Sequence, residues 1–227
     1  MKIPALIKLL FTICVGATLL NAEEPDPKRV APSGKYTIGN KPAIDAKELT
    51  VEPLGDGKFR LGQITIDASK RQLIFPVTLA EIQNQLEYAL VHSAGKAHES
   101  LLTTDVHPNH LHIAALLLFA KPGTQLEAEV HWRINGPPQS AKLADLLQIS
   151  DPHSKPITRT YPALTLAKLA AATELSLLSL INDPASLIAQ KLPDNDHRDD
   201  IYRFKPNPKL PGKGLPLTLV LTFPGKE

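Results

Sequence analysis

Apolar and polar residues alternate between Val51 and Pro76, and this period of two most limits what the chain can fold into. Successive side chains of a β-strand point to opposite faces, so the alternation predicts strands with one buried face. Asp56-Gly57 is typical of a hairpin turn, and Asp67–Arg71 has the composition of a polar turn. We therefore expect a meander of three or more antiparallel strands. Its alternating apolar residues are Ile64, Ile66, Leu73, Phe75 and Val77.

Further strands are expected along the rest of the chain. The same alternation continues from Gln85 to Val91, with Leu86, Tyr88 and Leu90 on one face. The other ranges that read as strands are Leu126–Ile134, Ile201–Phe204 and Leu215–Phe223. Together these segments predict an α+β protein with a mostly antiparallel sheet.

Two segments break this period and favour helix. A nearly unbroken block rich in Leu and Ala follows Pro108, which predicts a buried helix near 108–120, capped by Thr104 or Asp105. Asp183-Pro184 is typical of a helix start and predicts a short helix near 183–190. The stretch from Leu164 to Ile181 favours helix by composition but shows no clear period, so helix and strand both remain open there.

The first residues have the features of an export signal. Lys2 and Lys8 precede or flank an apolar stretch from Leu9 to Leu20, and Leu20-Asn21-Ala22 offers a cleavage site. We expect residues 1–22 to be a cleaved signal peptide, residues 23–49 to be a flexible polar lead, and residues 50–227 to form one domain. A bacterial protein with this plan is periplasmic or secreted, and the cleaved signal is its only expected contact with the membrane.

Charge and cysteine content narrow the function classes. Without Lys2 and Lys8, the 25 basic residues become 23, which equals the 23 acidic residues, so nothing favours nucleic acid as a partner. The only cysteine, Cys14, lies within the signal. A cysteine-free mature chain has no disulfide, no thiolate for an iron–sulfur cluster and no cysteine nucleophile. Any site chemistry must then depend on imidazole and carboxylate groups.

Histidines gather in one part of the chain. Six of the eight histidines fall within forty residues, and they are His92, His98, His107, His110, His112 and His131. Imidazole and carboxylate together suit zinc. The zincin spacing is not met, because Leu102 stands four residues after His98. His107 and His110, beside Pro108 and Asn109, are expected to be solvated loop residues.

Several motifs resemble the YdjY-domain family of secreted bacterial proteins. They are Gly95-Lys96-Ala97-His98-Glu99-Ser100-Leu101-Leu102, Leu111-His112-Ile113-Ala114-Ala115-Leu116-Leu117-Leu118 and Lys121-Pro122-Gly123. The resemblance covers roughly Leu54–Pro224 and is specific only within Phe59–Gly123. It implies a strand over Glu174–Ile181, a glycine where Phe119 stands, and no activity that can be named.

The residues that match the family pattern are His98, Glu99 and His112, with Ser100 next to them. The resemblance leaves three interpretations open: a structural hydrogen-bonded pair between Glu99 and His112, a metal site, or an acid–base pair. We take the structural pair as the first expectation. Ser100 lacks the Gly-x-Ser-x-Gly context of a hydrolase nucleophile, so it is a candidate for binding only.

The expected function is that of an exported, non-enzymatic module that binds a ligand or an envelope protein, or has a structural role in the envelope, without a cofactor. The alternative is a metal-dependent hydrolytic enzyme, with zinc held by His98, Glu99 and His112. If Glu99 has a purely structural role, it forms a buried polar pair that contributes to stability and takes no part in chemistry.

Overall fold

In the computed structural model of the chain, the described residues are 49–82, 85–150, 164–166, 174–181, 183, 185–190, 203–208, 210–211 and 215–225. They belong to one unit of the chain, Lys41–Glu227. The expected signal peptide and all but the last residue of the expected lead lie outside the described residues. No helix in these ranges is long and apolar enough to cross a membrane.

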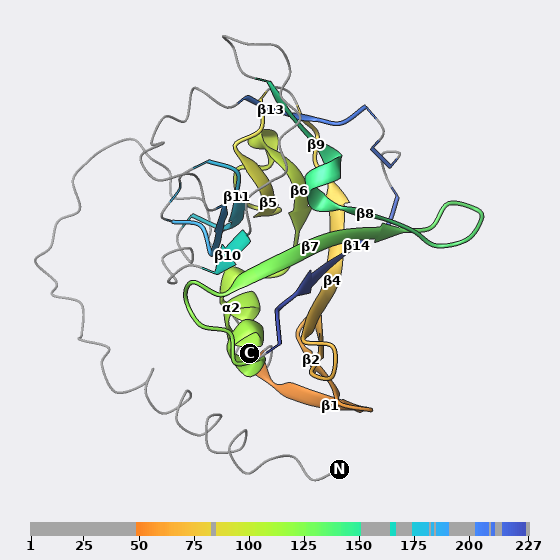
Figure 1. Ribbon diagram of the computed structural model, residues 1–227, viewed down its shortest axis with the longest axis vertical. Helices are drawn as coiled ribbons and strands as arrows, with labels where there is room; N and C mark the ends of the chain where they lie inside the picture. Colours follow the sequence, from red (N-terminus) through yellow and green to blue (C-terminus); the bar gives the residue numbers. More distant parts are fainter. Residues whose placement is uncertain are drawn as a thin grey trace, which may run out of the picture. The chain divides into compact units, whose positions relative to one another are not determined.

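The first four strands form the predicted antiparallel meander, which lies at the lower right of Figure 1. They are β1 (Val51–Gly55), β2 (Lys58–Leu61), β3 (Ile64–Asp67) and β4 (Gln72–Leu79). The turn between β1 and β2 has positive φ at Asp56 (48°) and Gly57 (74°), the conformation that an Asp-Gly hairpin favours. The alternation is confirmed, because Ile64, Ile66 and the odd-numbered residues Leu73–Val77 are buried.

The meander continues into a larger sheet that is mostly antiparallel, as expected. Its strand order is β1-β2-β3-β4-β14-β7-β10-β12-β11-β5-β6, and β8 pairs with β7. Parallel pairing occurs between β5 and β6 and between β11 and β12. These strands are β5 (Tyr88–His92), β6 (Ser100–Thr104), β7 (Gln125–Trp132), β8 (Gln139–Lys142), β10 (Leu164–Leu166), β11 (Ser176–Ser179), β12 (Ile188–Gln190) and β14 (Leu217–Thr222). A second sheet pairs β9 (Leu147–Ser150) with β13 (Arg203–Pro206).

Strand β4 also pairs with β6, the last strand of this order. Its residues Gln72–Val77 pair with β14, whereas Thr78 and Leu79 pair with Thr103 and Leu102 of β6. Pro76 has no N–H, and it lies between the residues that pair with β3 and those that pair with β6. Its carbonyl accepts a hydrogen bond of 2.7 Å from Thr104 Oγ1 of β6. A proline is tolerated here because no neighbouring strand requires its N–H.

The predicted buried helix is present as α2 (Pro108–Leu117). Leu111, Ala114 and Ala115 are buried in the same core as the strands. The expected cap is wrong, since His107 rather than Thr104 or Asp105 caps α2 and accepts the Asn109 N–H at Nδ1. Pro108 occupies the first helical position, where a missing N–H has no cost.

The end of α2 has the shape usually given by glycine, although Phe119 occupies that position. Phe119 has a φ of 59°, and the Ala120 N–H donates to the Ala115 carbonyl at 3.1 Å. The Phe119 N–H donates to the Leu116 carbonyl at 2.8 Å. These two bonds define a Schellman motif, in which a left-handed residue satisfies the last carbonyls of a helix. Phe119 thus ends the helix in a left-handed conformation in which a side chain is strained.

The expected short helix near 183–190 is wrong, because the chain forms a turn followed by β12. Asp183 Oδ1 accepts the Ala185 N–H at 2.8 Å, and Ile188 pairs with both Leu166 and Leu178. Pairing with two strands that are distant in the sequence outweighs the local helix signal. The strand implied over Glu174–Ile181 is confirmed as β11.

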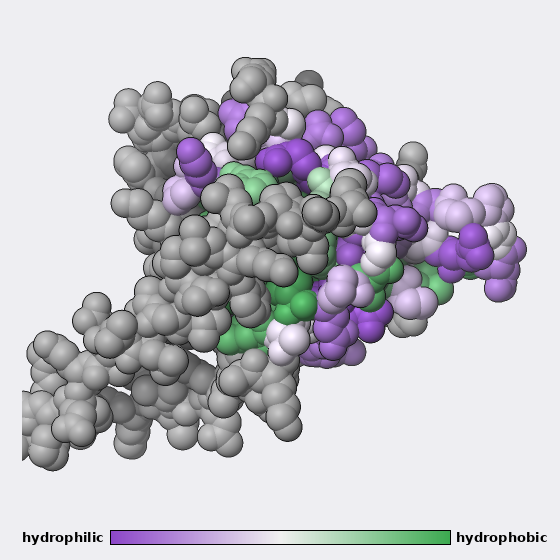
Figure 2. All heavy atoms as spheres, turned by 90° about the horizontal axis from the view of Figure 1, so that it is seen from below, coloured by the Kyte–Doolittle hydropathy of each residue, from purple (hydrophilic) through white to green (hydrophobic). Residues whose placement is uncertain are grey.

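Most large apolar side chains lie in a single core between the sheet and α2. Some remain on the surface, including Leu116 and Phe119 at the end of α2, which are 41% and 42% exposed. Figure 2 looks at the molecule from below and shows hydrophobic residues gathered in the middle of that face, with hydrophilic residues along one side.

Candidate functional site

Two of the four predicted site residues lie together on the surface. His98 and Glu99 belong to η2 (Ala97–Glu99), a single 3-10 turn between β5 and β6. His98 Nε2 is 3.2 Å from Glu99 Oε1, and the two side chains are 61% and 31% exposed. An ion pair this open to solvent contributes little to stability. It leaves both groups accessible.

Ser100 is close to them in sequence but points into the protein. It is fully buried at the start of β6, and its hydroxyl donates to the Leu102 carbonyl at 2.7 Å. A hydroxyl bonded within its own strand has no approach from solvent. Ser100 is therefore a structural residue in this arrangement and does not share a surface with His98.

The expected hydrogen bond between Glu99 and His112 is not formed. Glu99 contacts His98, and His112 Nδ1 is buried without a hydrogen-bond partner among the described residues. Glu99 lies in η2, just before β6, and His112 lies in α2, which follows that strand. Burial lowers the pKa of His112, which favours the neutral imidazole.

The positions of these residues also matter for the alternative that His98, Glu99 and His112 bind zinc. His98 and Glu99 meet, but the buried Nδ1 of His112 bonds to neither of them. Across the described part of the chain, no group of three His, Cys, Asp or Glu side chains is placed to hold a metal ion. The residues implied by the family resemblance thus do not form one site here.

Sequence reasoning missed the residue that fixes the η2 turn to the sheet. Lys96 Nζ donates to the Tyr88 hydroxyl at 3.1 Å and lies 5.3 Å from the centre of the Tyr88 ring. Burial raises the pKa of Tyr88, and the nearby Asp183 carboxylate adds to this. The hydrogen bond to Tyr88 raises the pKa of Lys96, with Glu99 and Asp183 contributing. Lys96 is therefore bonded to the Tyr88 phenol, and the charges of Glu99 and Asp183 act on its amine.

A cluster of buried histidines was also missed, and the interpretation of His107 and His110 as solvated is wrong. His92, His107 and His110 are 7%, 9% and 4% exposed. The ring centroids of His92 and His107 are 6.3 Å apart, and those of His107 and His110 are 6.0 Å apart. The helix cap explains their burial, because capping by His107 places it and His110 in the first turn of α2, which begins in the core. The dense histidines were a signal, but their burial was not visible in the sequence.

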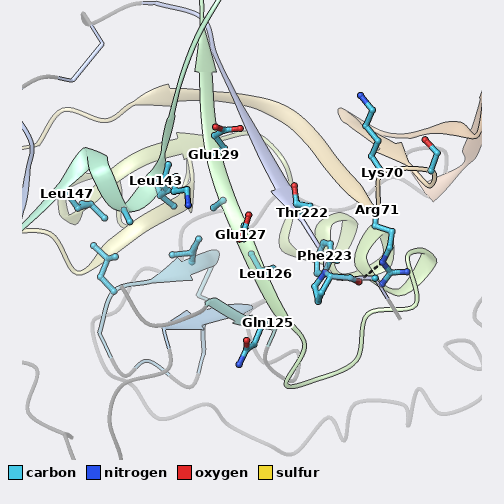
Figure 3. A pocket seen from close by; sticks show the side chains of 18 residues that line it. Lys70, Arg71, Gln125, Leu126, Glu127, Glu129, Leu143, Leu147, Thr222 and Phe223 are labelled. Atoms are coloured by element: carbon cyan, nitrogen blue, oxygen red, sulfur yellow. Dashed lines mark hydrogen bonds between the residues drawn. The ribbon is translucent and has the colours of Figure 1, made fainter. Parts of the chain in front are cut away.

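A groove opens on another part of the molecule. Its volume is about 830 Å³, and it lies beside β7 and the end of β14 (Figure 3). The floor contains buried apolar residues from four segments: Leu126, Ala128, Leu143, Leu147, Leu178, Leu180 and Phe223. None of the predicted site residues lines this groove. It could not have been predicted, because its walls come together only through the order of the strands.

The rim of the groove carries charges of both signs. Lys70, Lys142 and Glu127 are exposed side chains on it. Arg71 Nε donates to the Pro224 carbonyl at 2.7 Å, which holds the guanidinium against the chain end (Figure 3). Glu129 contacts His131 Nε2 at 2.8 Å and accepts from Ser140 Oγ at 3.1 Å. The rim thus offers polar contacts around an apolar floor.

No family model, curated protein or solved structure matches this chain. The resemblance to YdjY-domain proteins therefore stays a prediction from the residues.

Proposed function

We propose that this chain is an exported binding module that takes an amphipathic ligand in the groove beside β7 and β14. The observation that carries the proposal is the combination of a buried leucine-rich floor with a rim of Lys70, Lys142 and Glu127. Such a surface suits a molecule with an apolar body and polar or charged ends, since each part finds its own environment.

The size of the groove is consistent with a small ligand. Its volume of about 830 Å³ falls within the roughly 300–1,000 Å³ range of small-molecule sites. A floor supplied by strands and by η3 (Leu143–Leu146) is held by the core and does not depend on the ligand. Export is part of the proposal and is supported by the apolar stretch between Lys8 and Asn21. The protein would then meet its ligand in the periplasm or outside the cell.

The test uses 8-anilinonaphthalene-1-sulfonate, an aromatic anion whose fluorescence rises in apolar surroundings. We expect saturable binding to the full chain. Ala144→Trp places an indole in the groove and should abolish most of the fluorescence rise, because Ala144 lines it. Gln125→Trp narrows the groove from β7 and should act in the same direction. Circular dichroism verifies that both variants fold.

Ala94→Trp is the matched control, since Ala94 is exposed and does not line the groove. It should bind the dye as the unmodified chain does. If both groove variants fold and still bind the dye with unchanged affinity, the groove is not the binding site. The apolar surface at the end of α2 would then become the better candidate.

A further inference from the structure

Two of the clustered histidines act as hydrogen-bond acceptors in the same way. His92 Nδ1 accepts the Ala94 N–H at 3.1 Å, and His107 Nδ1 accepts the Asn109 N–H at 3.1 Å. In both cases the donor is two residues further along the chain. This is the turn that Asn and Asp side chains commonly make, built here from imidazole. The His92 turn leads into η2, and the His107 turn begins α2.

Such a turn exists only while the imidazole is neutral. A neutral ring has one nitrogen that accepts and one that donates, whereas a protonated ring has two donors. Nδ1 of His92 and of His107 must therefore carry no proton in this fold. Protonation would set an Nδ1–H against the Ala94 or Asn109 N–H and remove both turns.

The surroundings of the two rings disfavour a positive charge. Both residues are less than 10% exposed, and His107 stands at the N-terminus of α2, where the helix dipole repels cations. The rings that face each other are those of His92, His107 and His110, and the Asp105 carboxylate lies near His92. Burial lowers the pKa of His92, although the Asp105 charge and a hydrogen bond to the Asp105 backbone oppose this. Asp105 itself accepts a hydrogen bond from Ser93 Oγ.

Both turns are tied to their neighbours, so their loss would move more than one side chain. The His92 carbonyl accepts the Gly95 N–H at 2.7 Å, and the His92 N–H donates to the Leu175 carbonyl at 2.9 Å. A Cβ on Gly95 would lie 3.1 Å from the His92 carbonyl oxygen and 3.3 Å from Leu175 Cβ. Gly95 thus ties the His92 turn to Leu175 of the neighbouring segment.

We propose that His92 and His107 form an acid-sensitive latch, which holds the start of α2 and the turn before η2 at neutral pH and releases them when the two imidazoles are protonated. The latch is independent of the groove and of its ligand. Its opening would free Lys96 and η2 from β5 and uncap α2, while the sheet remains formed.

The test follows the Ala94 and Asn109 amide signals by NMR as the pH is lowered from 7.5 to 4.5. We expect both signals to shift together in a transition below about pH 6.5, the ordinary value for histidine. His92→Asn and His107→Asn keep an acceptor for each turn but cannot be protonated. The double variant should stay folded and lose most of this transition. His98→Asn changes an exposed histidine and should leave it unchanged.

Two results would overturn the latch. One is that the imidazoles of His92 and His107 become protonated while the Ala94 and Asn109 amides do not move. The other is that the double Asn variant undergoes the same transition as the unmodified chain. If the double variant fails to fold, the single variant His107→Asn decides. Asn is among the strongest helix caps, so α2 should be preserved. The Asn109 amide signal should then no longer shift between pH 7.5 and 4.5.

Discussion

At the scale of single residues, side chains that satisfy backbone groups hold the turns of this protein. Asp67 is the clearest case, with 1% exposure and three hydrogen bonds to Oδ1. The donors are the Ser69 N–H (3.1 Å), the Ser69 hydroxyl (2.6 Å) and the Lys70 N–H (3.0 Å). Burial raises the pKa of Asp67, but these bonds and the charges of Lys58 and Lys70 outweigh it and lower the pKa overall. The turn between β3 and β4 therefore depends on an ionised carboxylate.

Replacing Asp67 tests this dependence. Asp67→Ala removes the charged acceptor of the Ser69 and Lys70 N–H groups and should lower the free energy of unfolding by about 1–3 kcal/mol at pH 7. Because the pKa is lower in the folded state, the contribution is complete above the unfolded value of about 3.9 and is lost as the pH falls through the folded value. Asp67→Asn should flatten the acid limb of the stability curve. Urea unfolding between pH 2 and pH 7 measures both effects, and an unchanged acid limb in Asp67→Asn would contradict this role.

Phe119 gives a second prediction at this scale. A non-glycine residue in the left-handed region is strained by roughly 1 kcal/mol, and the Phe119 side chain is 42% exposed. Phe119→Gly should therefore raise the melting temperature. Leu116→Gly is the control, because Leu116 is equally exposed but lies inside α2, where glycine costs about 1 kcal/mol. If both variants lower the melting temperature equally, the phenyl ring of Phe119 stabilises the fold by more than the backbone strain destabilises it.

At the scale of elements, the sequence predicted what local patterns determine. Alternation located β3 and β4, whose apolar residues Ile64, Ile66, Leu73, Phe75 and Val77 are buried, and the leucine-rich block located α2. The helix predicted over 183–190 is wrong, because Ile188 pairs with Leu166 and Leu178, and both of these residues lie outside that segment. For the same reason, the sequence did not show that His107 starts a buried helix. Propensity decides an element only where tertiary pairing does not oppose it.

The hydroxyl of Thr104 adds to the pairing between β4 and β6, and its contribution can be tested. Thr104 Oγ1 donates to the Pro76 carbonyl and accepts the Val106 N–H at 3.2 Å. Thr104→Val keeps the shape and removes both bonds, so we expect a loss of about 1–2 kcal/mol in the free energy of unfolding. Thr103→Val is the control, since Thr103 Oγ1 only meets Thr78 Oγ1 at the surface. If Thr104→Val and Thr103→Val lower the free energy of unfolding by similar small amounts, Thr104 does not hold β4 and β6 together.

At the scale of the whole molecule, the predicted site and the groove are different places. His98 and Glu99 were found as neighbours, because adjacent residues in one turn need no tertiary information. The expected bond between Glu99 and His112 is not seen, since Glu99 contacts His98 and the buried His112 Nδ1 has no hydrogen-bond partner among the described residues. The groove combines β7, β11, η3 and the end of β14, segments more than ninety residues apart at the extremes, and no spacing in the sequence reveals such a surface. Function is therefore better argued here from shape than from motif.

The most direct test of the groove maps the binding of 8-anilinonaphthalene-1-sulfonate onto backbone amide signals by NMR. If the ligand sits in the groove, the largest shifts fall on residues 125–129, 142–144, 147 and 222–225, which line it. Shifts gathered at the exposed end of α2, around Leu116 and Phe119, or spread evenly over the chain, would contradict the proposal that this protein binds an amphipathic ligand between β7 and β14.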